Sequence, residues 1–312
     1  PNDAAQRLDK FLKKAVPKMP QSLLYRAIRQ KKIKVNGKRT EISYRLCDGD
    51  VVCLYLNDDL FDTAPQEYDF LSAPAELDIV YEDENILLAN KKPGLCVHED
   101  NDHSADTLIA RILHYLYKKG EYDPKKEQSF TPSLCNRIDR NTSGIVIAAK
   151  NAESLRILNE RIKERELKKY YLCVASGHFA QKSATLSHFL VRNENESLVR
   201  VFDKPQKNGR TILTKYKVLK ESKENSLVEV ELLTGRTHQI RAHFAYVGHP
   251  LIGDGKYGSN ATNRRYGQKY QLLCSYKLTF AFSDTEHLLG YLNGRTFTVK
   301  NVWFADAFSQ TF

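Results

Sequence analysis

Apolar residues near the start of the chain recur every three or four positions, the spacing that places side chains on one face of a helix. The segment from Pro17 to Pro20 separates two such stretches, and Ser22 can cap the second one. The apolar positions are Leu8, Phe11, Leu12 and Ala15 in the first stretch and Leu24, Ala27 and Ile28 in the second. The pattern predicts two short amphipathic helices.

Short strands and tight turns follow these helices. The segment 33–35 reads as a strand that ends in the turn pair Asn36-Gly37. A second turn at 48–50 leads into a strand that begins at Val51. We therefore expect a small α/β unit within about the first 55 residues.

The rest of the chain mixes helical and extended patterns. The expected helices are 106–116, 151–162 and 237–247, and the expected strands are 145–149, 171–175 and 227–233. In the last strand Val228, Val230 and Leu232 alternate with two glutamates, which is typical of a half-exposed antiparallel strand. The pattern excludes an all-helical protein and a regular βαβ protein.

Charge divides the chain into three parts. Residues 1–55 carry 13 Lys and Arg against 5 Asp and Glu, a net charge of +8, while residues 57–84 carry 10 acidic groups and no basic one. This distribution indicates a basic domain at 1–56, an acidic linker at 57–75 and a larger domain at 76–312, as in a two-domain nucleic-acid protein. The competing interpretation is that the lysines only solvate a helix face.

Several classes of protein are excluded by what the sequence lacks. No apolar run approaches the ~20 residues of a membrane span, and the N-terminus has no apolar signal-peptide region. The six cysteines form no C-x-x-C pair, so we expect reduced thiols and neither a zinc site nor a redox dithiol. We expect a cytoplasmic protein with no membrane contact and no bound metal.

The candidate chemistry centres on Asp139, in the run CNRIDRNTSGIVIAAK. Arg137 and Arg140 flank Asp139, and opposite charge nearby lowers the pKa of a carboxyl group, so we expect this one to stay ionised at neutral pH. Turn-forming residues follow and lead into the strand at 145–149, which would hold Asp139 on a rigidly supported loop. An ionised carboxylate in that position suits a nucleophile better than a proton donor.

This run resembles the signature loop H-R-L-D-x-x-T-S-G of the RluA-type pseudouridine synthases, with Asn136 and Ile138 as departures. Three further stretches are similar to that family in the same order along the chain. They are 81–94, whose Lys92-Pro93-Gly94 is a shifted form of a K-P-x-G turn, 169–177 and 233–258. Four ordered matches over about 180 residues make a chance likeness implausible.

The resemblance implies roles for individual residues. Asp139 would be the catalytic carboxylate, Arg236 would pair with it and hold it ionised, and Tyr171 would stack on the target uracil and assist proton removal. Arg137 would fill the gap left by a flipped uridine, with an ordinary surface ion pair as the alternative. Arg140 and Thr142 are the further substrate-binding candidates, and His238, Gln239 and Arg241 the expected supporting residues.

The resemblance also implies a fold and a reaction. The family fold is α+β, with a mixed, mainly antiparallel sheet and an active cleft across its middle. The reaction isomerises uridine without redox change or net group transfer, so no cofactor is expected. RNA would be the partner, large-subunit ribosomal RNA is favoured over transfer RNA, and we expect a monomer.

The first 55 residues are similar to the small alpha-L RNA-binding domain first described in a ribosomal small-subunit protein. The likeness rests on R-L-D-K-F-L, K-I-K-V-N-G-K and D-G-D-V-V. In that family the second helix and the basic turn after it hold RNA, through phosphate contacts that add salt-dependent affinity without reading sequence. The candidate RNA-binding residues are Arg26, Arg29, Lys31, Lys32, Lys34, Lys38 and Arg39.

Two other functions compete with this interpretation. A catalytically silent RNA-binding or ribosome-assembly protein would have no need of a carboxylate among phosphates. A carboxylate-dependent glycoside or nucleoside hydrolase usually has two paired carboxylates, and no second one stands out here. The presence of Asp139, Tyr171 and Arg236 together favours the synthase.

Overall fold

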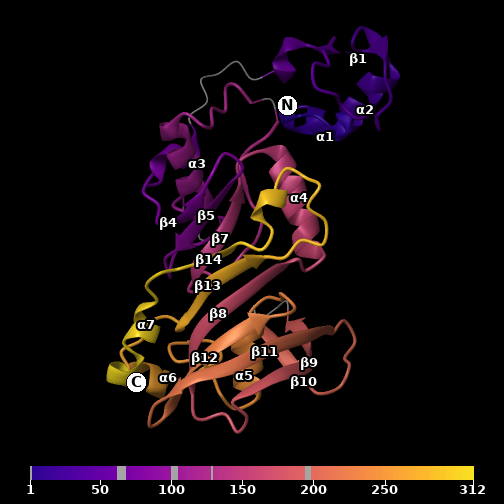
Figure 1. The fold of residues 1–312 in the computed structure, drawn as a ribbon. Coiled ribbons are helices and arrows are strands. Elements are labelled where there is room, and N and C mark those ends of the chain that lie inside the picture. Colours follow the sequence, from indigo (N-terminus) through magenta and orange to yellow (C-terminus); the bar gives the residue numbers. More distant parts are fainter. Residues whose placement is uncertain (1, 62–67, 100–104, 128, 194–197) are drawn as a thin grey trace.

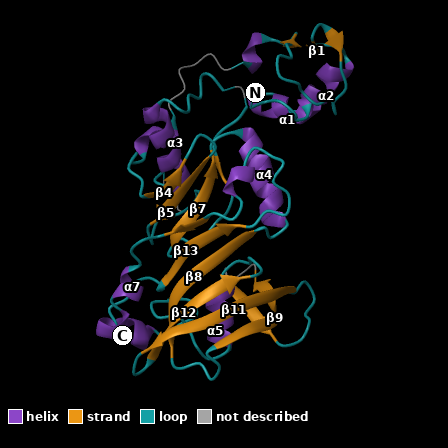
Figure 2. Ribbon diagram, viewed as in Figure 1, coloured by secondary structure: helices purple, strands orange, loops and turns teal. Residues whose placement is uncertain are grey.

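The computed structural model describes residues 2–61, 68–99, 105–127, 129–193 and 198–312. The N-terminal unit lies at one end of the molecule, apart from a long sheet that runs through the larger part of the chain (Figure 1). Strands dominate that larger part, and helices pack against the sheet (Figure 2). The predicted α+β fold, with a mixed and mainly antiparallel sheet beside a small α/β unit, is confirmed.

The N-terminal unit has its own apolar core. Helices α1 (Leu8–Ala15) and α2 (Gln21–Arg29) pack against a sheet in the order β2 (Lys38–Arg39), β1 (Ile33–Val35) and β3 (Val52–Leu54). The predicted apolar positions supply most of that core, because each helix turns one face toward the sheet. About the first 55 residues therefore form one hydrophobic cluster.

The predicted cap of the second helix is wrong. Helix α2 begins at Gln21, and Pro20 occupies the N-cap position without a side-chain hydrogen bond. Ser22 lies inside the first turn instead. Pro20 lacks a backbone N–H but stands before the helix, so it removes no helical hydrogen bond, and α2 starts two residues earlier than a cap at Ser22 would require.

The larger part of the chain contains an eleven-stranded sheet in the order β10-β9-β11-β12-β8-β13-β7-β5-β4, with β14 paired to β13 and β6 to β7. Its strands are β4 (Ile79–Glu82), β5 (Ile86–Lys91), β6 (Ser133–Leu134), β7 (Ser143–Ala149), β8 (Leu167–Ser176), β9 (Ser183–Asn193), β10 (Leu198–Phe202), β11 (Arg210–Glu221), β12 (Asn225–Leu232), β13 (Leu273–Phe280) and β14 (Thr296–Thr298). The alternation predicted for the strand at 227–233 holds, because Val228 and Val230 are buried while the glutamates between and after them are partly exposed.

The two halves of this sheet meet where β13 inserts between β7 and β8. Strands β13 and β7 run parallel and share only two residue pairs, Cys274 with Ser143 and Ser275 with Gly144. Gly144 has a φ of 107°, and a Cβ there would clash with the backbone of Ser275. A glycine is required at this junction, because any other residue would be strained and would push the halves apart.

Helices pack on the sheet close to the expected ranges, although the helix expected at 106–116 runs from Leu108 to Lys119. Helix α3 (Leu108–Lys119) is capped by the side chain of Thr107, and α4 (Ala152–Lys163) by that of Asn151. Helix α5 (Gln239–Tyr246) is shorter than the predicted 237–247. The remaining helices are α6 (Asn260–Arg265), α7 (Trp303–Asp306) and α8 (Phe308–Thr311), with 3-10 turns η1 (Asp58–Leu60), η2 (Asp69–Ser72) and η3 (Gly290–Leu292).

Two segments connect the N-terminal unit with the sheet. Near the chain start, Gln6 Nε2 donates to Ser129 Oγ at 2.7 Å, and Arg156 in α4 donates to the carbonyl of Ala4 at 3.3 Å. Within the predicted linker, Phe70 packs on the cluster that includes α3. The second part of that acidic segment therefore lies against the larger domain. Across the described ranges, no helix has the length and apolarity that crossing a membrane requires.

Candidate active site

A cleft of about 660 Å³ lies over the middle of the sheet. Its walls come from the loop that precedes β7, from strand β8, and from the turn between β12 and α5. These segments are far apart in sequence, and the central position of β8 and β13 in the sheet brings them together. The sequence-predicted residues that line the cleft are Arg137, Asp139, Arg140, Thr142, Tyr171, Arg236, His238, Gln239 and Arg241.

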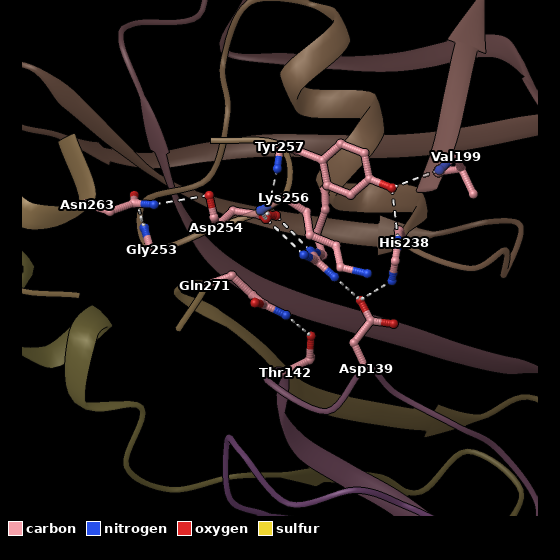
Figure 3. Close-up of polar contacts among 11 residues, drawn as sticks. Asp139, Thr142, Val199, His238, Gly253, Asp254, Lys256, Tyr257, Asn263 and Gln271 are labelled. Carbon is pink, nitrogen blue, oxygen red and sulfur yellow. Dashed lines mark hydrogen bonds and ion pairs between the residues drawn. The ribbon is translucent and has the colours of Figure 1, made fainter. Parts of the chain in front are cut away.

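Arg241 is the partner of the Asp139 carboxylate. Its Nη1 donates to Asp139 Oδ2 at 2.8 Å, while its Nε and Nη2 bind the two oxygens of Asp254 at 2.7 and 2.8 Å (Figure 3). Burial alone would raise the pKa of Asp254, but the hydrogen bonds from Arg241 outweigh burial and hold that pKa below its usual range. A fixed, buried guanidinium thus aims the Asp139 side chain into the cleft.

The predicted ion pair between Arg236 and Asp139 is therefore wrong. Arg236 is exposed at the edge of the cleft, in the turn before α5. Its backbone N–H donates to Gln239 Oε1 at 3.1 Å, which fixes the turn. Because α5 begins at Gln239, Arg241 lies on the helix and its side chain reaches Asp139. Arg236 lies in the turn before the helix, at the edge of the cleft.

Gln239 is the buried anchor of that turn. Its Nε2 donates to the carbonyl of Leu213 and to Thr214 Oγ1, each at 3.1 Å, and its Oε1 accepts from Thr234 Oγ1 at 3.0 Å. All of these partners are protein groups, so Gln239 supports the loop as expected. Its side chain has no hydrogen-bonding capacity directed at a ligand.

His238 stands between Asp139 and Tyr257. Its Nδ1 lies 2.9 Å from the Tyr257 hydroxyl, and its Nε2 lies 4.0 Å from Asp139 Oδ2 (Figure 3). Burial lowers the pKa of His238, with Asp139 opposing that shift. The ring is therefore neutral at neutral pH.

Tyr171 lies on the cleft side of β8 and Tyr170 does not. Tyr171 is buried and hydrogen-bonded to the side chain of Ser275, and burial raises its pKa to about 12. Tyr170 instead stacks with Lys277, whose Nζ lies 4.2 Å from its ring centroid. Because successive side chains on a strand point to opposite faces, only Tyr171 can lie against a base in the cleft.

Lys91 supports the loop of Asp139 through hydrogen bonds to backbone carbonyls, and the sequence did not point to this residue. Its ammonium group is buried and donates to the carbonyls of Lys92, Leu95 and Arg140 at 3.0, 2.7 and 2.7 Å. Burial lowers the pKa of Lys91 to about 8. The sequence signal for Lys91 is its position at the end of the apolar strand Ile86–Lys91, but the shifted turn motif points to Lys92 instead.

Lys169 is a second cation that sequence reasoning missed. It precedes Tyr171 by two residues on β8 and lines the same cleft. Burial lowers its pKa, and within the described residues its ammonium makes no ion pair. An unpaired cation in the same cleft as Asp139 is suited to bind an anionic group of a ligand.

The other residues of the Asp139 loop differ in exposure. Arg137 is exposed at the cleft, and Arg140, also exposed, donates through Nε to the carbonyl of Gly94 at 3.2 Å. Thr142 is buried and accepts a hydrogen bond from Gln271 at 3.1 Å. Asn136 accepts from the backbone N–H of Ile147 at 2.8 Å, which ties the loop to β7. Thr142 and Asn136 therefore shape the loop, while Arg137 is available to a ligand.

Several of the predicted RNA-binding cations share one face of the small sheet. Lys34 pairs across the sheet with Arg39 on one side and Cys53 on the other. Its Nζ lies 5.3 Å from the ring centroid of Tyr55, which is 59% exposed. Lys32 belongs to the same face by strand alternation, and none of these three cations forms an ion pair with a described residue. Arg26 and Arg29 lie in the last turn of α2.

No group of three or more His, Cys, Asp and Glu side chains in the described ranges could hold a metal ion. The charged groups of the cleft are instead two carboxylates, Asp139 and the exposed Glu99, and the basic side chains around them. Such a set of groups can supply a nucleophile, a hydrogen-bonding neutral histidine and cations for phosphate groups.

Comparison with known proteins identifies the family. The RNA pseudouridylate synthase family matches residues 85–246, and the S4 domain matches residues 6–52. The ribosomal large subunit pseudouridine synthase C of Vibrio vulnificus is 34% identical over 91% of this chain and 87% of that protein. An uncharacterized RNA pseudouridine synthase of Mycoplasma capricolum is 32% identical over 97% of both chains.

A solved structure supports the same assignment. The human RNA pseudouridylate synthase domain containing 1 superposes with a TM-score of 0.55 at 28% identity, over 69% of this chain and 82% of that chain. The family match covers the loop of Asp139, the strand of Tyr171 and the helix of Arg241, and the S4 match covers the separate basic unit. The chain therefore belongs to the RNA pseudouridylate synthase family and carries an N-terminal S4 domain.

Proposed function

We propose that this RNA pseudouridine synthase acts on large-subunit ribosomal RNA, with Asp139 as its nucleophile. The choice of RNA is supported by the names of similar proteins such as the Vibrio vulnificus enzyme. The role of Asp139 is supported by its position, since Arg241 directs its carboxylate into a cleft lined by basic residues. That ion pair is the observation that carries the proposal.

The reaction requires a bond to break and another to form on the same nucleotide. The bond from ribose C1′ to uracil N1 breaks, the base turns, C1′ joins C5, and the proton leaves C5. Asp139 attacks either the ribose or the base to permit this exchange, and it needs no other reactant. Tyr171, a neutral phenol in the cleft wall, would stack on the base and assist removal of the C5 proton.

The uridine must leave its helix or loop to reach Asp139, which costs a few kcal/mol. Arg137 is exposed beside Asp139 and would occupy the vacated position, and Lys169 would hold a phosphate of the flipped nucleotide. Arg140 and Arg236, both at the edge of the cleft, would contact the flanking backbone. The S4 domain would add salt-dependent affinity through its exposed cations.

This substrate also suggests where and how the protein works. An enzyme of ribosomal RNA would act in the cytoplasm, beside the assembling large subunit. We propose a monomer with its boundaries at 1–56, 57–75 and 76–312, because the cleft is complete within one chain.

Replacing Asp139 by Asn tests the proposal. The side chain keeps its shape, and Arg241 keeps its two hydrogen bonds to Asp254, so the variant should fold and bind RNA as the wild type does. Removal of the charge should abolish pseudouridine formation, measured as tritium release from C5-labelled ribosomal RNA. Asp284→Asn, in an exposed loop, is the matched control and should retain full activity.

Measurable turnover in Asp139→Asn would refute the role of Asp139. Activity of the wild type on transfer RNA but not on large-subunit RNA would instead overturn only the choice of substrate. A wild type that binds RNA and releases no tritium from any RNA would favour the catalytically silent alternative.

A further inference from the structure

The two oxygens of the Asp139 carboxylate have different surroundings. Oδ2 accepts the hydrogen bond from Arg241 and is also the oxygen nearest to His238. Among the described residues no group hydrogen-bonds to Oδ1, and no dashed line reaches this oxygen in Figure 3. The site thus distinguishes a held oxygen from a free one.

The hydrogen bonds around Tyr257 favour one tautomer of His238. The backbone N–H of Val199 donates to the Tyr257 oxygen at 3.0 Å, so that contact does not use the hydroxyl proton. His238 Nδ1, 2.9 Å away, is the only acceptor for that proton within the described part of the chain. Nδ1 is then unprotonated, and the ring proton is on Nε2, which faces Asp139.

The backbone at His238 supports this orientation. His238 has a φ of 54°, in the left-handed region that residues other than glycine seldom adopt. The turn is held by the Gln239 N–H, which donates to the carbonyl of Arg236 at 3.0 Å. A turn fixed in this way aims the ring between Tyr257 and Asp139.

We propose that His238 is a positioning residue that, as the Nε2–H tautomer set by Tyr257, binds Asp139 Oδ2 when RNA fills the cleft. The 4.0 Å separation is too long for a hydrogen bond, and such contacts tighten in the substrate complex. His238 and Arg241 then hold Oδ2 together, which leaves Oδ1 as the attacking oxygen. This inference rests on the proposed role of Asp139.

The charged neighbours of His238 are consistent with a neutral donor. Arg241 and Lys256 oppose a positive charge on the ring, whereas Asp139 and Asp254 favour one. Burial lowers the pKa of His238 in the same direction as Arg241 and Lys256 do. The ring therefore stays neutral and can donate a hydrogen bond without carrying charge. A neutral donor holds the carboxylate without neutralising it as a nucleophile.

Two substitutions of His238 separate positioning from mere support of the backbone. In His238→Gln the side-chain amide reaches about as far as Nε2 and can donate to Asp139. In His238→Asn it reaches only about as far as Nδ1, although asparagine suits the left-handed backbone better than glutamine does. Positioning therefore predicts that Gln is more active than Asn, and a purely structural role predicts the reverse.

We expect His238→Asn to lower kcat by about 10- to 100-fold, the size of effect that a small misplacement of a reacting group produces. We expect KM for RNA to stay within about twofold of the wild type and Gln to recover a large part of kcat. Equal activity of the two variants, or greater activity of Asn, would overturn the inference.

The tautomer can be measured without any activity. Nitrogen NMR of histidine-labelled protein, with the His238 signal assigned from its loss in His238→Asn, should show the proton on Nε2. Tyr257→Phe removes the hydroxyl and should allow both tautomers. A proton on Nδ1 in the wild type would overturn the inference.

The failures of the two proposals are distinguishable. If Asp139→Asn stays active, the proposed function falls whatever the tautomer is. If Asp139→Asn is inactive but Gln is no better than Asn at position 238, only the role of His238 falls.

Discussion

The cations of the S4 domain and those of the cleft are arranged in opposite ways. Lys32, Lys34 and Arg39 face solvent without ion pairs, whereas the Arg241 side chain is 6% exposed and lies between two carboxylates. Exposed cations attract phosphate in proportion to their number and are screened by salt, so their exact positions matter little. A buried cation aims one carboxylate, so its position is decisive. The molecule therefore separates affinity from chemistry.

The largest effect should follow from breaking the buried arrangement. Arg241→Met leaves Asp254 buried without its partner and should lower the free energy of unfolding by about 3–5 kcal/mol, together with loss of activity. Arg236→Met, at an exposed position of the same motif, should change stability by less than about 0.5 kcal/mol. Denaturant unfolding of both variants measures the difference, and equal losses would contradict the assignment of Arg241.

A second buried group should make the larger domain sensitive to acid. His243 is fully buried between His188 Nδ1 and Thr214 Oγ1, at 2.7 and 2.8 Å, and burial lowers its pKa to about 4. The unfolded chain binds this proton near its ordinary pKa, so unfolding takes up a proton between about pH 6.5 and 4. Stability should therefore fall as the pH drops through that range, by at most about 3 kcal/mol from His243.

Substitution isolates that contribution. His243→Gln should flatten the dependence of unfolding free energy on pH between about 6.5 and 4, whatever its effect at pH 7. The control His178→Gln, at an exposed position, should leave the slope unchanged. An unchanged slope in His243→Gln would show that other groups cause the sensitivity.

The smallest effect should come from the exposed cations. A triple alanine variant of Lys32, Lys34 and Arg39 should bind ribosomal RNA several-fold more weakly, with the slope of log affinity against log salt reduced by about 2. Its melting temperature and its kcat at saturating RNA should match the wild type. A triple variant of Lys118, Lys125 and Lys126, outside the S4 domain, is the control for charge alone. Equal salt slopes for the two triple variants would contradict RNA binding by this face.

The sequence was sufficient wherever a local pattern determines the structure. The amphipathic repeats of the first helices, the alternation around Val228 and the polar loop that carries Asp139 follow from neighbouring residues alone. The partner of Asp139 depends on where α5 begins, and the left-handed turn at His238 moves that start by two residues. The resemblance pointed to Arg236, whereas the structure pairs Arg241 with Asp139 and with Asp254, which lies 13 residues beyond Arg241.

Lys91 shows the same limit in another form. Strand β5 ends at Lys91 and Lys92 follows it directly, and only the pairing of β5 with β7 determines that Lys91 is the lysine bound to the Asp139 loop. Lys169 was missed because its burial depends on strands that are distant in sequence. Tertiary contacts, not local propensity, decide which lysines belong to the site.

The junction at Gly144 has a consequence for the order in which the protein is made. Asp139 belongs to the half of the sheet that is synthesised first, and strand β13 (273–280), which joins that half to the strand of Tyr171, is synthesised late. A ribosome releases residues in sequence order, so Asp139 and Arg241 both leave the tunnel before strand β13 can join the two halves of the sheet. A nascent chain shorter than about 280 residues should thus be able to hold RNA through its S4 domain without modifying it.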